Sequence, residues 1–188
     1  YFCPLSEHKY QKDVCFANER PVNSFQDVKK EAELMRARGA GITGGDPLCK
    51  LKRTLEYIKK LKETFGPKFH IHLYTSLDLV DEKILTQLHQ AGLDEIRFHL
   101  DFDNKLWKKL ELAKKFDWDI GVEVPVIPGK QMKEMIDFIH DKVQFVNVNE
   151  LEVADNELSK LTQMGYKVKD QLSYGVKDSL QAGIRLIQ

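Results

Sequence analysis

The sequence lacks an excess of charge of either sign, and it lacks long hydrophobic runs. Its 188 residues include 29 basic and 29 acidic side chains, for a formal net charge of +0. This balance gives no footprint for broad binding to nucleic acid, so we expect no nucleic-acid partner. No apolar run approaches the roughly 20 residues of a membrane span, and the start lacks the basic, apolar and small-residue order of a signal peptide. We therefore expect no membrane association.

Cysteine is also scarce, with Cys3, Cys15 and Cys49 as the three thiols of the chain. Three scattered cysteines are too few for a disulfide framework. Their spacing also differs from that of a zinc site, where paired cysteines sit about two to four residues apart. Free thiols indicate a reducing compartment, so we expect a cytoplasmic protein. We interpret Cys15 and Cys49 as small apolar residues or incidental thiols.

Strand and helix patterns alternate along the chain with a period of about 25 residues. Apolar and β-branched runs predict strands at 40–43, 69–76, 94–101, 118–129 and 143–153. Amphipathic stretches predict helices at 24–39, 50–66, 80–92, 104–117, 130–142, 155–165 and 176–187. Repeated βα units predict an α/β fold with a parallel sheet, closed toward a barrel or spread as a doubly wound sheet. No low-complexity linker divides the chain, so we expect one domain over residues 1–188.

The carboxyl ends of the predicted strands are where such folds bind ligands. The segment "GITGGDP" at one of these ends has two consecutive glycines, Gly44 and Gly45, which let the backbone approach a ligand closely. It does not match a phosphate-binding loop, which needs a GxxxxGK[ST] or GxGxxG pattern. The alternative is a tight turn whose glycines only supply positive φ angles. The residues themselves leave both interpretations open.

Histidines recur on the predicted strands. His70 and His72 share one face by strand alternation, so a metal pair is conceivable, although such histidines more often satisfy hydrogen bonds within a groove. Arg97 and His99 also share one face of their strand. The pattern does not tell whether that face points inward.

One carboxylate lies within an otherwise apolar strand. Glu123 is costly to bury unless it is paired or belongs to a site. Its simpler explanation is an ion pair with Arg97 or with a lysine of a neighbouring helix. Asn147 and Asn149 share a face near the end of the next strand, where their amides could bind a ribose or the backbone.

Together, four segments of this sequence resemble the radical S-adenosylmethionine (radical SAM) superfamily. They are "YFC" at the start, "TGGDP" at 43–47, "VPVIPG" at 124–129 and "NVNELEV" at 147–153. The hallmark of that superfamily is a CxxxCxxC loop, and Cys3 is similar to its third cysteine, with the other two expected upstream of Tyr1. The resemblance is greatest to an archaeal group related to pyruvate formate-lyase activating enzyme. It implies a partial TIM-type (β/α)6 barrel whose first strand is missing from an N-terminally truncated chain.

The resemblance implies a [4Fe–4S] cluster and SAM as cofactors. Cys3 is then a metal ligand, and Phe2 occupies the aromatic position near the adenine. Gly44, Gly45, Asp46 and Pro47 match the GGEP-type motif, whose backbone binds the SAM amino group, with Asp replacing the usual Glu. The segment 124–129 resembles the strand that lines the adenine. We add Glu123, directly before it, and Asn149, the best match to a ribose or adenine contact, to the cofactor-binding residues.

The implied activity is reductive cleavage of SAM to a 5′-deoxyadenosyl radical, which abstracts hydrogen from an unidentified substrate. The implied partner is a reductant such as ferredoxin or flavodoxin, and the side opening of a partial barrel can admit a macromolecular substrate. Two alternatives stay open. One is a homologue without a cluster that binds a partner protein, and the other is a TIM-barrel enzyme without iron that uses Glu123 or a histidine as a base.

Overall fold

The computed structural model of the chain describes residues 9, 12–127, 130–154 and 159–186. Within these residues, five parallel strands form one sheet in the order β3-β4-β5-β6-β7. The strands are β3 (Gly39–Ile42), β4 (His70–Ser76), β5 (Glu95–His99), β6 (Asp119–Val126) and β7 (Phe145–Glu150). Neighbours in the sheet are consecutive in the chain, so a helical segment connects each pair. The predicted α/β fold with a parallel sheet is confirmed.

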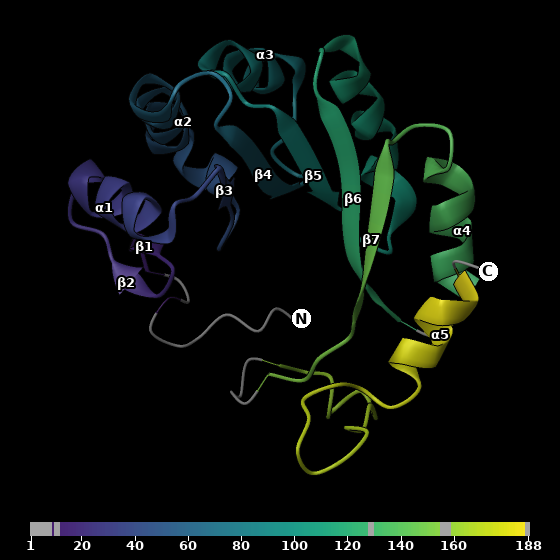
Figure 1. Cartoon of the computed structure of the whole chain (residues 1–188). Coiled ribbons are helices and arrows are strands. Elements are labelled where there is room, and N and C mark those ends of the chain that lie inside the picture. The colour runs from purple at the N-terminus through teal and green to yellow at the C-terminus, as the bar shows by residue number, and fades with distance from the viewer. Residues whose placement is uncertain (1–8, 10–11, 128–129, 155–158, 187–188) are drawn as a thin grey trace.

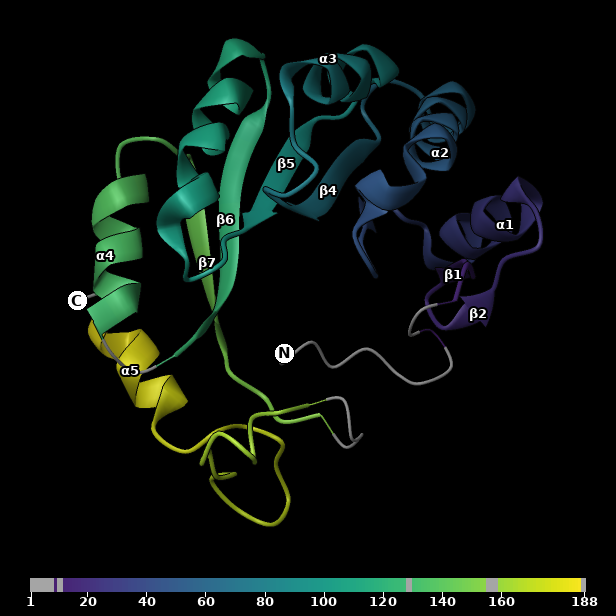
Figure 2. The same cartoon turned by 180° about the vertical axis from the view of Figure 1, so that it is seen from behind.

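The helices cover one side of this sheet. They are α1 (Phe25–Met35), η1 (Pro47–Lys50), α2 (Leu51–Phe65), α3 (Glu82–Ala91), η2 (Asn104–Lys115), α4 (Lys130–Ile139) and α5 (Ser179–Leu186). Both views show α2, α3 and α4 along the outside of a curved sheet (Figures 1 and 2). The sheet and these helices form a half-barrel. A short antiparallel hairpin, β1 (Phe16–Ala17) and β2 (Arg20–Pro21), lies beside α1. No described helix is long and apolar enough to span a membrane.

The hydrophobic core lies between the sheet and the helices. Leu73, Ile96 and Phe98 point from the strands into it and are fully buried, as are Leu85 of α3 and Leu110 of η2. Because side chains alternate along a strand, the residues between these apolar positions project from the opposite face. That inner face is where the polar residues of the strands are found.

Helix α1 begins as predicted, with Ser24 as its N-cap, but it ends at Met35 and not at Gly39. The C-cap is Arg36, in the left-handed conformation with φ of 52°. Gly39 has a different role, because it is the first residue of β3. A Cβ on Gly39 would lie 2.3 Å from the backbone oxygen of His70, so only glycine allows β3 to approach β4 here.

The segment after β7 differs from its predicted helix at 155–165. Residues 155–158 lie outside the described residues, and the described part, 159–165, contains a turn at 161–165. Leu161 in this turn is buried with Leu151 and Val176 in a second, small hydrophobic cluster. This segment is therefore held in place by the burial of a few apolar side chains, and its described part does not form a helix.

Helix α5 returns the chain to the ends of β6 and β7. Its first residue, Ser179, is fully buried. The Ser179 hydroxyl donates to the carbonyl of Val126 at 2.9 Å and accepts from the amide of Leu151 at 2.8 Å. These two bonds join the last residue of β6 to the residue after β7, so α5 fixes the carboxyl ends of both strands.

We expect Leu73→Ala to lower the free energy of unfolding by about 2–5 kcal/mol, because it removes a fully buried side chain and leaves a cavity. Leu172→Ala is the matched control, since Leu172 is 100 % exposed, and it should change stability by less than about 0.5 kcal/mol. Urea unfolding followed by circular dichroism measures both. Equal midpoints for the two variants would contradict the placement of the core.

Candidate functional site

The inner face of the sheet is lined with polar side chains, which alternate with the buried apolar ones. They are His70, His72, Tyr74 and Ser76 of β4, Glu95, Arg97 and His99 of β5, Glu123 of β6, and Asn147 and Asn149 of β7. Since Ile96 and Phe98 face the helices, Arg97 and His99 face inward, which the sequence pattern left open. A polar face of this kind can hold a polar ligand.

Arg97 is at the centre of this face, and its side chain is 19 % exposed. Its guanidinium donates to the Tyr74 hydroxyl at 2.7 Å and to Glu123 Oε2 at 3.3 Å, and its Nε donates to Glu95. The rings of Tyr74 and Phe145 each lie 5.2 Å from the guanidinium. Burial alone would lower the pKa of Arg97, but the hydrogen bond and charge of Glu95 outweigh it and raise that pKa. Arg97 is therefore a permanent cation between two carboxylates.

Glu123 gathers three donors from neighbouring strands. In addition to Arg97, the Asn147 amide donates to Glu123 Oε2 at 3.0 Å and the Asn149 amide donates to Oε1 at 3.2 Å. Two residues predicted to bind a cofactor, Glu123 and Asn149, are thus in direct contact. The simpler explanation of Glu123 as the ion-pair partner of Arg97 also describes its surroundings. Cofactor binding by Glu123 and Asn149 stays a prediction.

The "GGDP" segment forms the turn between β3 and η1, and the carboxylate of Asp46 holds it in place. That carboxylate accepts hydrogen bonds from the Leu48 amide at 2.9 Å and from the Thr75 hydroxyl at 2.9 Å. It also accepts from the Ser76 amide at 3.0 Å and from the Ser76 hydroxyl at 2.9 Å. These donors come from η1 and from the end of β4. Asp46 therefore ties the turn to the sheet with its side chain.

The two glycines of the turn present bare backbone. Gly44 has a φ of 122°, in the region that favours glycine. A Cβ on Gly44 or Gly45 would meet no described atom within 4 Å, so both residues face open space. Pro47 is buried, and its carbonyl accepts from the Thr54 hydroxyl at 2.8 Å. Within "GGDP", Asp46 and Pro47 anchor the turn, and the glycines leave room for a ligand.

The glycine turn and the asparagine amides lie along the same edge of the sheet. The glycine turn follows the carboxyl end of β3, and the two asparagines lie in the carboxyl-terminal part of β7. These strands, β3 and β7, are the two outer strands of the sheet. Four strand spacings separate these strands, which corresponds to about 19 Å measured along the sheet. A ligand that contacts both groups must extend across the row of strands.

The predicted residues Phe2 and Cys3 lie outside the described residues, so their roles stay predictions. Of the other cysteines, Cys15 is partly buried and Cys49 is exposed. Burial, followed by the charge and hydrogen bond of Cys15, raises the pKa of Tyr57. Cys15 thus has Tyr57 as a neighbour, and its interpretation as a small apolar residue or incidental thiol stays a prediction.

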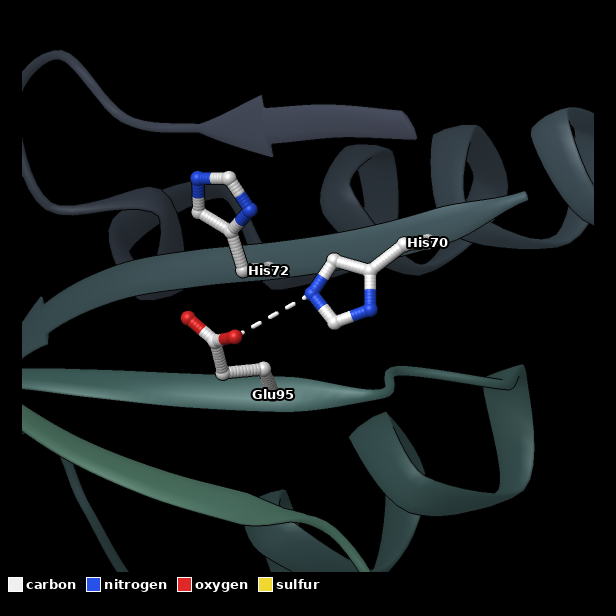
Figure 3. A group of neighbouring side chains, drawn as sticks. All are labelled: His70, His72 and Glu95. Atoms are coloured by element: carbon white, nitrogen blue, oxygen red, sulfur yellow. Dashed lines mark hydrogen bonds and ion pairs between the residues drawn. The ribbon is translucent and has the colours of Figure 1, made fainter. Parts of the chain in front are cut away.

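A second polar group lies toward the amino end of β4, where His70 and His72 meet Glu95 of β5 (Figure 3). His70 Nε2 is 3.1 Å from Glu95 Oε2. Burial, and secondarily the charge of Arg97, lowers the pKa of His72 below its ordinary value of 6.5. His72 is therefore a neutral imidazole at neutral pH.

Sequence reasoning missed Glu95 and Tyr74 as members of the inner face. Glu95 reads as the polar start of a strand, and nothing in the chain around it indicates a contact with His70, 25 residues away. The parallel register aligns Glu95 with His72 and Arg97 with Tyr74. Strand alternation could have placed Tyr74 beside the histidines, but the register between strands was needed to find its partner.

Comparison with known proteins identifies relatives over the whole chain. The sequence pattern of the radical SAM superfamily matches residues 1–141. A Methanocaldococcus jannaschii protein, provisionally named as a glycyl-radical enzyme activating enzyme, is 37% identical over 200 aligned positions. The match covers 100% of this chain and 53% of that protein. The chain therefore spans about half the length of this curated relative.

Solved structures share the fold at low sequence identity. Methylornithine synthase matches with a TM-score of 0.59 and 14% identity, over 93% of this chain and 55% of that one. The Kitasatospora setae radical SAM methyltransferase TsrM, solved with cobalamin and a [4Fe–4S] cluster bound, has a TM-score of 0.50 and 13% identity. That match covers 68% of this chain and 30% of TsrM. At these identities the likeness shows the fold alone.

We expect Asp46→Ala to lower the free energy of unfolding by about 2–4 kcal/mol, because it leaves several donors of the turn without their charged acceptor. Asp78→Ala is the matched control, since the exposed Asp78 carboxylate accepts a hydrogen bond from the Ser76 hydroxyl at 3.1 Å and does not contact the turn. Its effect should stay below about 0.5 kcal/mol. Chemical unfolding measures both. If Asp46→Ala were no less stable than Asp78→Ala, Asp46 would not anchor the turn.

Proposed function

This chain belongs to the radical SAM superfamily, and from this membership we propose that it forms the SAM-binding core of an enzyme that abstracts hydrogen from its substrate. When bound, a [4Fe–4S] cluster supplies an electron to SAM, whose C–S bond breaks to give methionine and a 5′-deoxyadenosyl radical. The protein has to bind SAM, orient it against one C–H bond and exclude competing reactions. Its own residues divide these tasks.

The cluster is held by thiolates in this proposal. Cys3 is one ligand, at the position of the third cysteine of the CxxxCxxC loop. We assign Phe2 to the aromatic position near the adenine because it directly precedes Cys3 in the sequence. Thiolate sulfur is the donor that iron–sulfur clusters require, and Cys3 is the cysteine that has the matching sequence context.

The glycine turn binds the amino acid end of SAM. The Cβ positions of Gly44 and Gly45 face open space, so we propose that a ligand can come close enough for their backbone carbonyl and amide groups to bond the ammonium and carboxylate of SAM. Asp46 contributes by holding the turn, because its carboxylate already accepts four hydrogen bonds from Leu48, Thr75 and Ser76. This division explains why Asp can replace Glu in the motif: the short side chain reaches its donors without occupying the ligand space.

The amides of β7 bind the nucleoside end of SAM. Glu123 is an acceptor, so Asn147 and Asn149 must each turn their NH₂ group toward it. Their Oδ1 atoms then face away from Glu123 as acceptors, which suits the hydroxyl groups of a ribose. Glu123 acts as a positioning residue here. In this proposal SAM lies across the curved edge of the sheet, between the glycine turn after β3 and Asn149 of β7.

The substrate we propose is a glycyl-radical enzyme, whose glycine Cα–H bond loses its hydrogen atom. The archaeal relative, which is 37% identical to this chain, is provisionally named as a glycyl-radical enzyme activating enzyme. Figure 1 shows the helices α2, α3 and α4 on the outside of the curved sheet, and we propose that a macromolecular substrate approaches its inner face. A ferredoxin or flavodoxin supplies the electron, and the reducing cytoplasm keeps the thiols free.

The observation that carries the proposal is the pair of glycines, Gly44 and Gly45, that face open space at the carboxyl edge of the sheet. Their turn is held by Asp46, whose carboxylate oxygens already accept hydrogen bonds from the protein. The test uses the full-length gene product, loaded with iron and sulfide under anaerobic conditions. We expect an iron–sulfur absorption band and, with a reductant, conversion of SAM to 5′-deoxyadenosine and methionine. Cys3→Ala should lose both signals. If the folded full-length protein binds no iron and does not cleave SAM, the proposal is wrong and the alternative of a homologue without a cluster is favoured.

Gly45→Val tests the turn itself. A Cβ at residue 45 meets no described atom within 4 Å, so the unfolding midpoint should change little, whereas the valine side chain projects into the space assigned to SAM. We expect the cluster-loaded variant to bind SAM about tenfold more weakly or worse by calorimetry. Gly45→Ala serves as a graded control with a smaller loss. Full SAM affinity in Gly45→Val would remove this turn from the SAM site.

A further inference from the structure

We propose that His70, His72 and Glu95 form a binding site for a first-row divalent metal ion, with Zn²⁺ as the best-suited ion, on the inner face of the half-barrel. This group is separate from the glycine turn. His72, the member of β4 nearer to the turn, lies four residues before Ser76, the residue that contacts Asp46, so about 13 Å of strand separates the two places. The inference does not depend on SAM or on the cluster.

Strand geometry brings the three side chains together. His70 and His72 are two residues apart on β4 and therefore point to the same face. The parallel register sets Glu95 of β5 opposite His72. One potential ligand atom from each residue lies within 4.8 Å of the other two. Figure 3 shows the His70 ring directed at the Glu95 carboxylate, while the His72 ring is turned away from it.

The distances suit a metal after a small adjustment. Ligand atoms about 2.1 Å from a tetrahedral ion lie about 3.4 Å from one another. His70 Nε2 and Glu95 Oε2 are already 3.1 Å apart. The widest pair, at up to 4.8 Å, needs a contraction of up to about 1.4 Å, which rotation of an imidazole side chain can supply.

Glu95 is held in a fixed orientation for this role. Its side chain is 9 % exposed, and its Oε1 accepts from Arg97 Nε. The other oxygen, Oε2, points toward His70. A carboxylate whose far oxygen is held by a second group is typical of metal sites, where such outer partners orient the ligand.

The local charges allow a cation. Glu95 and Glu123 together outnumber Arg97 by one negative charge, since both carboxylates contact that guanidinium. A divalent ion would change the net charge of this group from −1 to +1, so the magnitude of that charge would not increase. Neutral imidazole and carboxylate are donors that Zn²⁺ accepts, and two histidines with one glutamate form a known three-ligand set with open positions.

Solvent can complete the coordination. The His70 side chain is 47 % exposed, so an ion bound there would stay accessible to water or to a small anionic ligand. The ring of His72 lies over Gly41, where a Cβ would come within 2.5 Å of Nε2. The absence of a side chain at Gly41 therefore leaves room for the His72 ring on this face.

The test is calorimetric titration with Zn²⁺ of the chain whose cysteines are blocked by iodoacetamide, so that thiols do not contribute. We expect one saturable site per chain. His70→Gln and His72→Gln should each weaken Zn²⁺ binding by about 100-fold or more, the scale on which even outer partners of metal ligands act. His140→Gln is the matched control, because His140 is an exposed histidine that follows α4, is not a member of this group and bonds the Asp137 carbonyl.

A second measurement avoids chemical modification. In the unmodified chain, Zn²⁺ should shift the ring NMR signals of His70 and His72, assigned through their variants, and leave those of His140 in place. Circular dichroism in EDTA checks that every variant is folded. If Zn²⁺ shows no saturable binding, or if His70→Gln and His72→Gln bind it as tightly as His140→Gln, the metal site is overturned. Cleavage of SAM is unaffected by that result, so the two proposals fail separately.

Discussion

Arg97 lies largely buried on the inner face of β5, between the rings of Tyr74 and Phe145, with the carboxylates of Glu95 and Glu123 on either side. A permanent cation in such a position needs negative partners, because an unpaired buried charge is strongly destabilising. The partners come from two strands, so the ion pairs also connect β5 to β6. The polar character of the inner face follows from this requirement.

The Arg97 guanidinium lies between two groups of polar residues, one on the side of β7 and one on the side of β4. Toward β7, Glu123 turns the amides of Asn147 and Asn149 so that their oxygens point away from it. Toward β4, Glu95 directs one oxygen to His70. Each carboxylate therefore forms an ion pair with Arg97 and also contacts residues of a candidate site. Networks of this kind fix side-chain orientation because every member is constrained by the next.

Asp46 illustrates a similar division at the other candidate site. From the sequence, a carboxylate beside two glycines could be interpreted as a group that binds the ligand directly. Its oxygens are instead occupied by donors from η1 and β4, and the bare backbone next to it is what remains for a ligand. The turn and the strands thus present main-chain groups for recognition, while the acidic side chain supplies the rigidity that such recognition needs.

The sequence by itself determined the order of strands and helices, the parallel sheet, and the family. Period-two and helical patterns are local properties, so the strands near 40–43, 69–76 and 94–101 could be predicted before any contact was known. Boundaries were less certain. Gly39 looked like the end of a helix, but the close approach of the His70 carbonyl makes it the start of β3.

Only the tertiary structure decided which polar residues meet. Glu123 could be paired or free by its sequence context, and the register of β5, β6 and β7 placed Arg97 and two asparagines around it. Glu95 carried no local signal, since its partners His70 and Arg97 are defined by strand pairing and by the choice of face. Contacts across strands depend on register, and register is set by the packing of the whole sheet against its helices, which no short segment encodes.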